Sequence, residues 1–270
     1  MLTLDAYLGQ PLEIEPELRA MFHREAPLVI LDIGACEGEE SIRYARMFPQ
    51  ARIVAFEPRT DNLEKLNANL NRYQVNQRVT VLPYALSDRE GKARFYLSSG
   101  QPERHEANPE WDFGNKSSSL LPPSEQMGEH HAWLRFDHSV EVTTRRLDAC
   151  CAELGLERID FMHVDVQGAE LMVLAPAADL LKRTVSVWME VEAVELYKGQ
   201  PLRKEVEAFM YRLGFKKVIS TVGRVSGDQL YVRPELLSTG ARLSLHLVRA
   251  RRQSRTLLSK TAGRIVRAFR

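Results

Sequence analysis

The chain has 270 residues, with 37 Lys and Arg against 36 Asp and Glu and a formal net charge of +1. This balance excludes a strongly basic nucleic-acid-binding surface, the length suffices for one α/β domain with insertions, and no apolar run approaches the roughly 18 residues that a membrane span needs. The three cysteines have neither disulfide nor metal-ligand spacing, so we expect a cytoplasmic protein that binds no metal and carries no secretion signal.

Residues 1–26 precede the first predicted core strand. Leu18, Met21 and Phe22 follow a group of acidic residues and recur at helical spacing. We therefore expect an N-terminal helical cap that covers either the edge of the sheet or the ligand pocket.

A short apolar run over residues 28–33 is interrupted only by Asp32 and is followed by two glycines, Gly34 and Gly38. Such a run is typical of a strand that is buried on both faces of a parallel sheet, and residues 39–48 have the spacing of an amphipathic helix. A strand, a glycine turn and a helix in this order bind a ligand at the carboxyl end of the strand.

The charges around this turn indicate which ligand it takes. The turn lacks the middle glycine of GxGxxG, and Asp32, Glu37, Glu39 and Glu40 surround it, where a pyrophosphate would need neutralising contacts. A nicotinamide-dependent oxidoreductase is therefore the weaker alternative. S-adenosylmethionine (AdoMet) carries an ammonium and a sulfonium and no phosphate, so it suits an acidic glycine turn.

The next two predicted strands extend the ligand site. Residues 52–56 form a strand that ends at Glu57 and Pro58, where a carboxylate can accept hydrogen bonds from both ribose hydroxyls. Residues 78–85 form a third strand. At its end, Ser87 and Asp88 occupy the position at which many AdoMet-binding enzymes hold the adenine ring.

Residues 98–139 contain several prolines and little periodicity. A stretch of this length within a compact domain is usually a functional lid or a disordered insertion, and we predict a lid. Its aromatic residues, Trp111, Phe113, Trp133 and Phe136, have two interpretations of equal weight: faces on which a sugar stacks, or plugs that fix the insertion to the domain.

Three candidate general bases lie on two further predicted strands. In the strand over residues 159–166, His163 and Asp165 share one face, and Asp165 reaches the carboxyl end. Asp165 is either a base beside the transferred methyl group or a cap of the next helix, and His163 is either its partner or a buried core histidine. The strand over residues 184–191 ends near Glu190, the third candidate.

The predicted fold is a doubly wound α/β domain over residues 27–233 with a seven-stranded, mostly parallel sheet. Residues 215–220 and 229–233 form its closing antiparallel pair. Residues 234–270 form a basic tail in which Leu258, Ala262 and Ile265 recur at helical spacing. This amphipathic helix either lies on the inner membrane surface or packs on the domain or on a second subunit.

Six sequence blocks resemble the FkbM family of AdoMet-dependent methyltransferases. In chain order they are LDIGACEGEES, IVAFEP, YALSDREG, NKSSSLL, RIDFMHVDVQGAELMVL and VWMEVE. The resemblance implies a Rossmann-like class I methyltransferase fold, AdoMet as cofactor, and O-methylation of a hydroxyl on a sugar, glycan or polyketide-like acceptor. Cys36 replaces the usual Asn, and His163 and Gln167 replace the usual Lys and Glu. A non-catalytic AdoMet-binding module is therefore the alternative.

The predicted site combines these observations. The expected catalytic residues are Asp165, His163 and Glu190. The expected cofactor-binding residues are Asp32, Gly34, Ala35, Glu37, Gly38, Glu57, Pro58, Ala85, Ser87, Asp88 and Asp165. The expected partner is a small-molecule or glycan acceptor.

Overall fold

The computed structural model describes residues 3–103 and 112–268, with side chains described as far as Ser254. A seven-stranded sheet forms its centre, in the order β3-β2-β1-β7-β8-β10-β9. The first five of these strands are mutually parallel, and β10 runs antiparallel to both β8 and β9. The strands are β1 (Val29–Ile33), β2 (Arg52–Phe56), β3 (Val79–Leu82), β7 (Ile159–Val164), β8 (Thr184–Glu192), β9 (Lys216–Ser220) and β10 (Ser226–Val232). The predicted fold class is confirmed.

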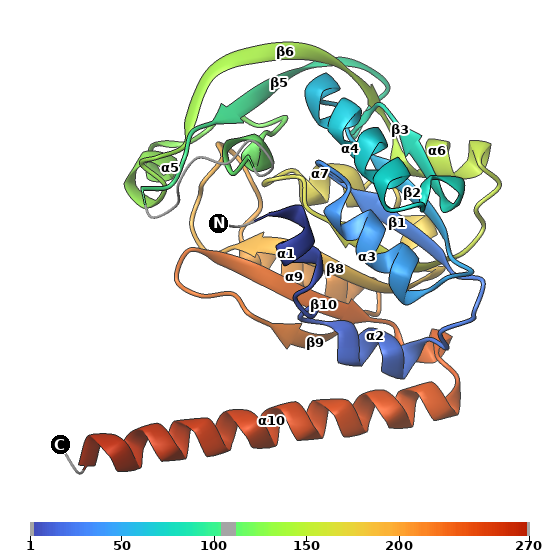
Figure 1. Ribbon diagram of the computed structural model, residues 1–270, viewed down its shortest axis with the longest axis vertical. Helices are drawn as coiled ribbons and strands as arrows, with labels where there is room; N and C mark the ends of the chain where they lie inside the picture. Colours follow the sequence, from blue (N-terminus) through green and yellow to red (C-terminus); the bar gives the residue numbers. More distant parts are fainter. Residues whose placement is uncertain (1–2, 104–111, 269–270) are drawn as a thin grey trace.

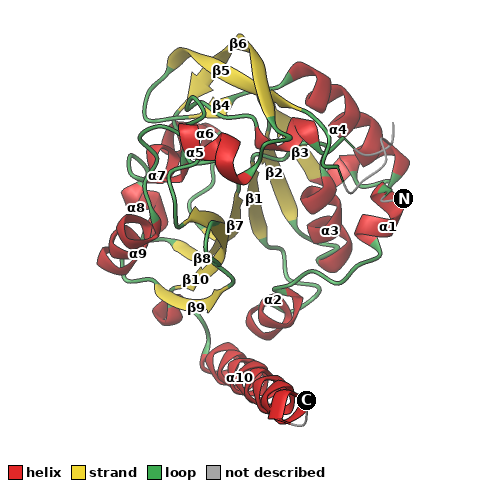
Figure 2. Ribbon diagram, turned by 90° about the vertical axis from the view of Figure 1, so that its left-hand side faces the viewer, coloured by secondary structure: helices red, strands yellow, loops and turns green. Residues whose placement is uncertain are grey.

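Helices cover both faces of this sheet (Figure 2). Because side chains alternate along a strand, Ile30 of β1 lies in the core on one face and Leu31 in the core on the other. The first face is covered by α1 (Leu4–Leu8), α2 (Glu15–Met21), α3 (Glu39–Met47) and α4 (Thr60–Arg72), and the second by α6 (Leu147–Glu153), α7 (Glu170–Leu174), α8 (Ala178–Leu181) and α9 (Arg203–Arg212). Two short 3-10 helices, η1 (Asn76–Arg78) and η3 (Pro234–Leu236), complete this part of the chain.

A second, three-stranded sheet arches over one end of the domain (Figure 1). It contains β4 (Ala85–Leu86), β5 (Gly91–Ser99) and β6 (Arg135–Arg145). The β5–β6 pairing continues to Ser99 and Arg135, so both ends of the predicted insertion over residues 98–139 are strand. Between them lie η2 (Gly114–Ser117) and α5 (Glu125–His130).

The aromatic residues of the insertion differ in their surroundings. Phe136 contacts Tyr197 edge to face, with ring centroids 6.2 Å apart, and belongs to a small apolar cluster with Met127. The interpretation as a plug therefore holds for Phe136. Trp111 lies outside the described residues.

The C-terminal helix α10 (Thr239–Ala268) packs beside α2. Its Leu245 is buried in the core on that side. The Arg252 guanidinium donates two hydrogen bonds, of 2.9 and 3.0 Å, to the fully buried carboxylate of Glu17, and a third to the backbone oxygen of Glu13. The predicted apolar stripe from Leu258 onward lies outside the residues whose side chains are described. Within the described chain, no helix combines the length and apolarity that crossing a membrane requires.

Arg252→Met is expected to lower the free energy of unfolding by about 1.5 to 3 kcal/mol, because the buried Glu17 carboxylate loses its guanidinium partner. Arg19→Met is the matched control. It breaks an ion pair with Glu15 in which the side chains are 46% and 32% exposed, and we expect a loss of about 0 to 1 kcal/mol. Urea unfolding followed by circular dichroism measures both. Equal losses in the two variants would contradict the contribution of the buried pair.

Candidate active site

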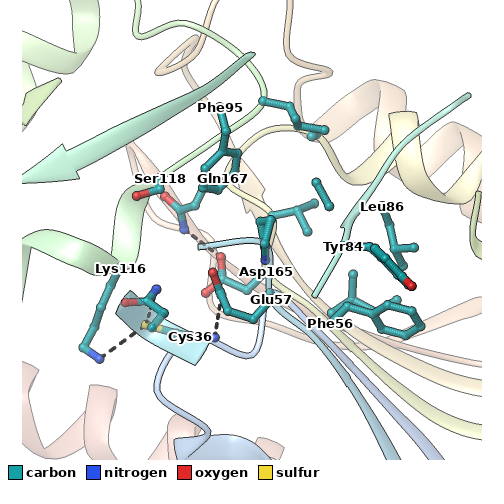
Figure 3. A pocket seen from close by; sticks show the side chains of 18 of the residues that line it. Cys36, Phe56, Glu57, Tyr84, Leu86, Phe95, Lys116, Ser118, Asp165 and Gln167 are labelled. Atoms are coloured by element: carbon teal, nitrogen blue, oxygen red, sulfur yellow. Dashed lines mark hydrogen bonds between the residues drawn. The ribbon is translucent and has the colours of Figure 1, made fainter. Parts of the chain in front are cut away.

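Two adjoining cavities lie at the carboxyl ends of the parallel strands. The first contains Glu57, and the second contains His163 and Glu190. Gly34, Cys36, Lys116 and Asp165 line both cavities. The first is further lined by Ile33, Phe56, Glu57, Pro58, Asn62, Tyr84, Ala85, Leu86, Phe95, Asn115, Ser118, Leu120, Val166, Gln167 and Ala169, as Figure 3 shows in part.

Gly34 permits β1 and β7 to approach each other at this edge. Its φ is +89°, and a Cβ atom at this position would lie 1.9 Å from the backbone oxygen of Asp165. Only glycine fits such a contact in the left-handed region. The backbone N–H groups of Gly34 and Ala35 both donate to the oxygen of Phe56, which fixes the turn against β2.

Glu57 lies in the first cavity with its carboxylate held by two backbone amides. The N–H of Cys36 donates to Oε2 (2.9 Å) and that of Arg59 to Oε1 (2.8 Å). Each carboxylate oxygen can accept a second hydrogen bond, so the fixed group fits two ribose hydroxyls. Burial raises the pKa of Glu57 to about 8.

Glu57→Ala is expected to weaken binding of S-adenosylhomocysteine by about 1 to 3 kcal/mol in free energy, the usual loss for a hydrogen bond to a charged group. Only the ionised carboxylate accepts from both hydroxyls. In the wild type, affinity should therefore rise as the pH increases toward about 8 and then level off, and in the variant this rise should disappear. Calorimetry measures both effects, with Glu64→Ala on the exposed side of α4 as the control. Unchanged affinity of Glu57→Ala would remove the ribose assignment.

Apolar and aromatic side chains surround the rest of the first cavity. Phe56, Tyr84 and Leu86 lie on one side of Glu57 in Figure 3, and Phe95 of β5 lies on another. This environment suits the faces of an adenine ring, which is flat and largely apolar. The second sheet thus supplies part of the wall of the first cavity.

Ser87 and Asp88, which were predicted to hold adenine, line neither of the two cavities. After β4 the chain turns away from the main sheet. The N–H of Ser87 donates to the backbone oxygen of Arg145, and the Asp88 carboxylate pairs with Arg89 at the surface. Ala85, which was also predicted, does line the cavity.

Glu37 and Gly38 have supporting positions, although both were predicted to contact the cofactor. The Glu37 carboxylate accepts hydrogen bonds from Lys65 and from Asn115, both at 2.7 Å. Gly38 caps α3 with a φ of +85° and faces Leu66. Both residues hold the glycine turn and do not line either cavity.

Residues of the insertion enter the site. Asn115 and Lys116 of η2 line the first cavity, and Lys116 Nζ contacts the Glu39 carboxylate and lies 3.8 Å from the Cys36 sulfur. These residues belong to the NKSSSLL block, which was the sequence signal for them. The insertion therefore contributes side chains to the first cavity, whereas Trp133 lines neither of the two cavities.

The second cavity opens beside the first, on the α3 side of the sheet. It contains all three predicted bases and Asp32 and Ala35. Its further lining residues are Tyr7, Gln10, Pro11, Leu12, Glu13, Glu39, Glu40, Arg43, Trp188 and Asp228. The N-terminal cap thus forms one wall of this cavity. Sequence patterns did not indicate Asp228, which lies opposite Glu190 in the β8–β10 pairing.

His163 is paired with Asp32 across β1 and β7. Its Nδ1 lies 3.7 Å from Asp32 Oδ1 and 3.2 Å from the Tyr44 hydroxyl, and Ser41 donates to the same Asp32 carboxylate. Burial lowers the pKa of His163 to about 4 and raises that of Asp32 to about 7. The imidazole is therefore neutral near pH 7. Its nearest carboxylate partner was expected to be Asp165, but the carboxylate within 4 Å of its Nδ1 belongs to Asp32.

Asp165 and Glu190 lie close together at the boundary of the two cavities. Gln167 Nε2 donates to both, at 2.6 Å to Asp165 Oδ1 and 2.7 Å to Glu190 Oε2. Asp165 does not cap α7, because the carboxylate of Glu170 accepts the backbone N–H groups at that turn. Burial is the main cause that raises the pKa of Asp165 and of Glu190.

Among the described residues, no group of three or more His, Cys, Asp or Glu side chains has the arrangement of a metal site. The two adjoining cavities can instead place a ligand and an acceptor next to each other, beside the carboxylates of Asp165 and Glu190. The doubly wound sheet, the acidic residue after β2 and the glycine turn after β1 together define an AdoMet-dependent methyltransferase.

Comparisons with known proteins identify the family. The model of the methyltransferase FkbM domain matches residues 32–217, and the chain belongs to this family. It is 35% identical over 220 residues to the 2-O-methyltransferase NoeI of Sinorhizobium fredii, and the aligned part covers 81% of this chain and 84% of that protein. It is 30% identical over 200 residues to the methyltransferase sdnD of Sordaria araneosa, with coverage of 69% and 73%. A crystal structure of a SAM dependent methyltransferase from Aquifex aeolicus aligns with a TM-score of 0.39 and 14% identity, covering 86% of this chain and 100% of that one.

Proposed function

We propose that this methyltransferase transfers the methyl group of AdoMet to a hydroxyl of a sugar, glycan or related natural product. The observation that carries the proposal is the meeting of the cofactor cavity and the second cavity at Asp165, with Glu190 and His163 nearby. The relative that is a 2-O-methyltransferase supports oxygen as the acceptor atom. The family match gives no support to a nicotinamide-dependent oxidoreductase.

The residues of the second cavity are suited to this chemistry. Bound AdoMet supplies an electrophilic methyl group on its sulfonium. A sugar hydroxyl is a poor nucleophile near pH 7, so a base within hydrogen-bond reach that accepts its proton is expected to help. Asp165 and Glu190 are placed to accept it, and the walls from α1 and β10 position the acceptor, which supplies much of the rate enhancement.

A methyl-transfer screen tests the proposal. The wild type is incubated with AdoMet labelled in its methyl group and with glycans, nucleotide sugars or lipid-linked saccharides, and the acceptor fraction is counted. We expect label in a hydroxyl-bearing acceptor. Label that appears only in acceptors modified at nitrogen or carbon would overturn O-methylation while leaving the family assignment intact.

We further propose that the distal part of α10 mediates association, at an anionic membrane surface or with a second copy of the chain. Two observations support it: the basic residues of the sequence after Ser254, and the course of α10 along one side of the domain, with its C-terminus beyond β9 (Figure 1). The proximal part of the helix is already packed on α2 through Leu245 and Arg252.

Sedimentation with vesicles distinguishes the two forms of association. A chain ending at Ser254 keeps the contacts of Arg252 and is the appropriate comparison. For membrane association, only the full chain should sediment with anionic vesicles at low salt, and neither protein with neutral vesicles, since each basic residue near such a surface contributes about 1 kcal/mol. Equal recovery in the supernatant rules the membrane out, and sedimentation velocity then tests self-association.

A further inference from the structure

Gln167 lies between two carboxylates at the place where the cavities meet. It follows β7, and its side-chain nitrogen Nε2 lies 2.6 Å from Asp165 Oδ1 and 2.7 Å from Glu190 Oε2. An amide nitrogen carries two hydrogens, so each carboxylate receives one. Figure 3 shows Gln167 directed at Asp165 from the wall of the cofactor cavity. One side chain therefore fixes carboxylates from two strands.

The other end of this amide is also fixed. The Tyr197 hydroxyl lies 2.7 Å from Gln167 Oε1 and 2.8 Å from the backbone oxygen of Ser117, and Ser119 Oγ donates to the backbone oxygen of Gln167 (2.7 Å). Ionised carboxylates only accept hydrogen bonds, so the amide nitrogen faces them and the amide oxygen faces the Tyr197 hydroxyl. The backbone of Gln167 has a φ of +55°, which is uncommon for a residue other than glycine. Ser119 of the insertion and Tyr197 thus hold Gln167 in place.

We infer that Gln167 is a positioning residue of the methyl transfer, and that its two amide hydrogens hold Asp165 and Glu190 as a pair that faces the acceptor cavity. This inference rests on the proposed function, because the pair would accept the proton of the acceptor hydroxyl. Gln167 itself acts through the two carboxylates.

In this chain, which has His163 where the family usually has Lys, an amide suits this position better than the family's usual Glu. Two ionised carboxylates at such close range raise each other's pKa, and hydrogen bonds donated to the ionised form oppose this. A carboxylate in place of the amide would add a third negative charge and remove both donors. The remaining titratable or charged groups around the pair are His163, Lys116, Glu40, Glu170, Glu192, Tyr197 and Asp228, most of them acidic.

Carboxyl carbon NMR tests the inference without an acceptor. Protein labelled with ¹³C at Asp and Glu carboxyls is titrated, and the signals of Asp165 and Glu190 are assigned from Asp165→Asn and Glu190→Gln. In Gln167→Glu both midpoints should move upward by about one pH unit or more, and kcat near pH 7 should fall at least about tenfold.

Two further variants make the test specific. Gln167→Asn retains an amide and tolerates the left-handed backbone, but its side chain is one methylene too short to bridge both carboxylates. It should therefore also raise the titration midpoint of Asp165 or of Glu190. This variant provides the test if Gln167→Glu does not fold. Gln74→Glu is the matched control, since Gln74 is exposed and has a φ of +57°. Midpoints in the Gln167 variants that coincide with those of the wild type would overturn the inference. Absence of O-methylation by the wild type would instead contradict the proposed function and would leave the titration result as the test of the inference.

Discussion

Asp165→Asn is expected to reduce kcat by about 100- to 10,000-fold, the range over which a positioned general base contributes. The asparagine keeps the size of the side chain but cannot accept the hydroxyl proton. The fold should be retained, because the Asp165 carboxylate does not cap α7 and its backbone N–H still bonds to Ile33. Steady-state kinetics with labelled AdoMet and the acceptor found in the screen measure the effect.

The control for this variant is Asp88→Asn. Asp88 pairs with Arg89 outside both cavities, so its neutralisation should leave kcat and cofactor affinity unchanged. Near-full turnover by Asp165→Asn would show that the base lies elsewhere, and Glu190→Gln would then be the next variant to measure.

Gly34→Ala is expected to abolish measurable binding of S-adenosylhomocysteine and to destabilise the protein strongly. The added Cβ would lie 1.9 Å from the backbone oxygen of Asp165, so β1 and β7 would have to separate at the edge that forms both cavities. A side chain at this position could also reduce binding by intruding on the ligand. That effect is secondary to the contact between the two strands. Calorimetry and thermal unfolding measure the two effects.

Gly155→Ala is the control that separates the effect of the contact between strands at Gly34 from the effect of the left-handed backbone conformation. Gly155 has a φ of +65°, but no atom lies within 4 Å of its added Cβ. It should therefore cost only the strain of the left-handed conformation, about 1 to 2 kcal/mol, and should bind the cofactor analogue normally. A Gly34→Ala protein that binds like the wild type would contradict the close approach of β1 and β7.

Sequence patterns predicted the central sheet well because its strands are buried on both faces. Such strands are continuous apolar runs, and their carboxyl ends are marked by Gly34, Glu57 and Asp165. The doubly wound arrangement then brings these ends together. Residues 135–139 of β6 were assigned to the insertion because they are mostly exposed and, apart from Phe136, polar.

The parts of the site that could not be predicted depend on contacts between distant segments. Nothing near Gln167 in the sequence indicates that its amide meets Glu190, which lies on another strand. Asp228 enters the second cavity only because β10 pairs with β8. Asp88 follows β4, which joins the second sheet through a pairing of Ala85 and Leu86 with β6 that has no local signal.

The central claim is that this FkbM-family enzyme transfers a methyl group from AdoMet to an oxygen atom at the junction of the two cavities. The most direct test is NMR of the product formed from AdoMet that carries a ¹³C-labelled methyl group. We predict a labelled methyl ether in the product of the wild type and its near absence with Asp165→Asn. A labelled methyl group on nitrogen or carbon, or equal product from both proteins, would contradict the account.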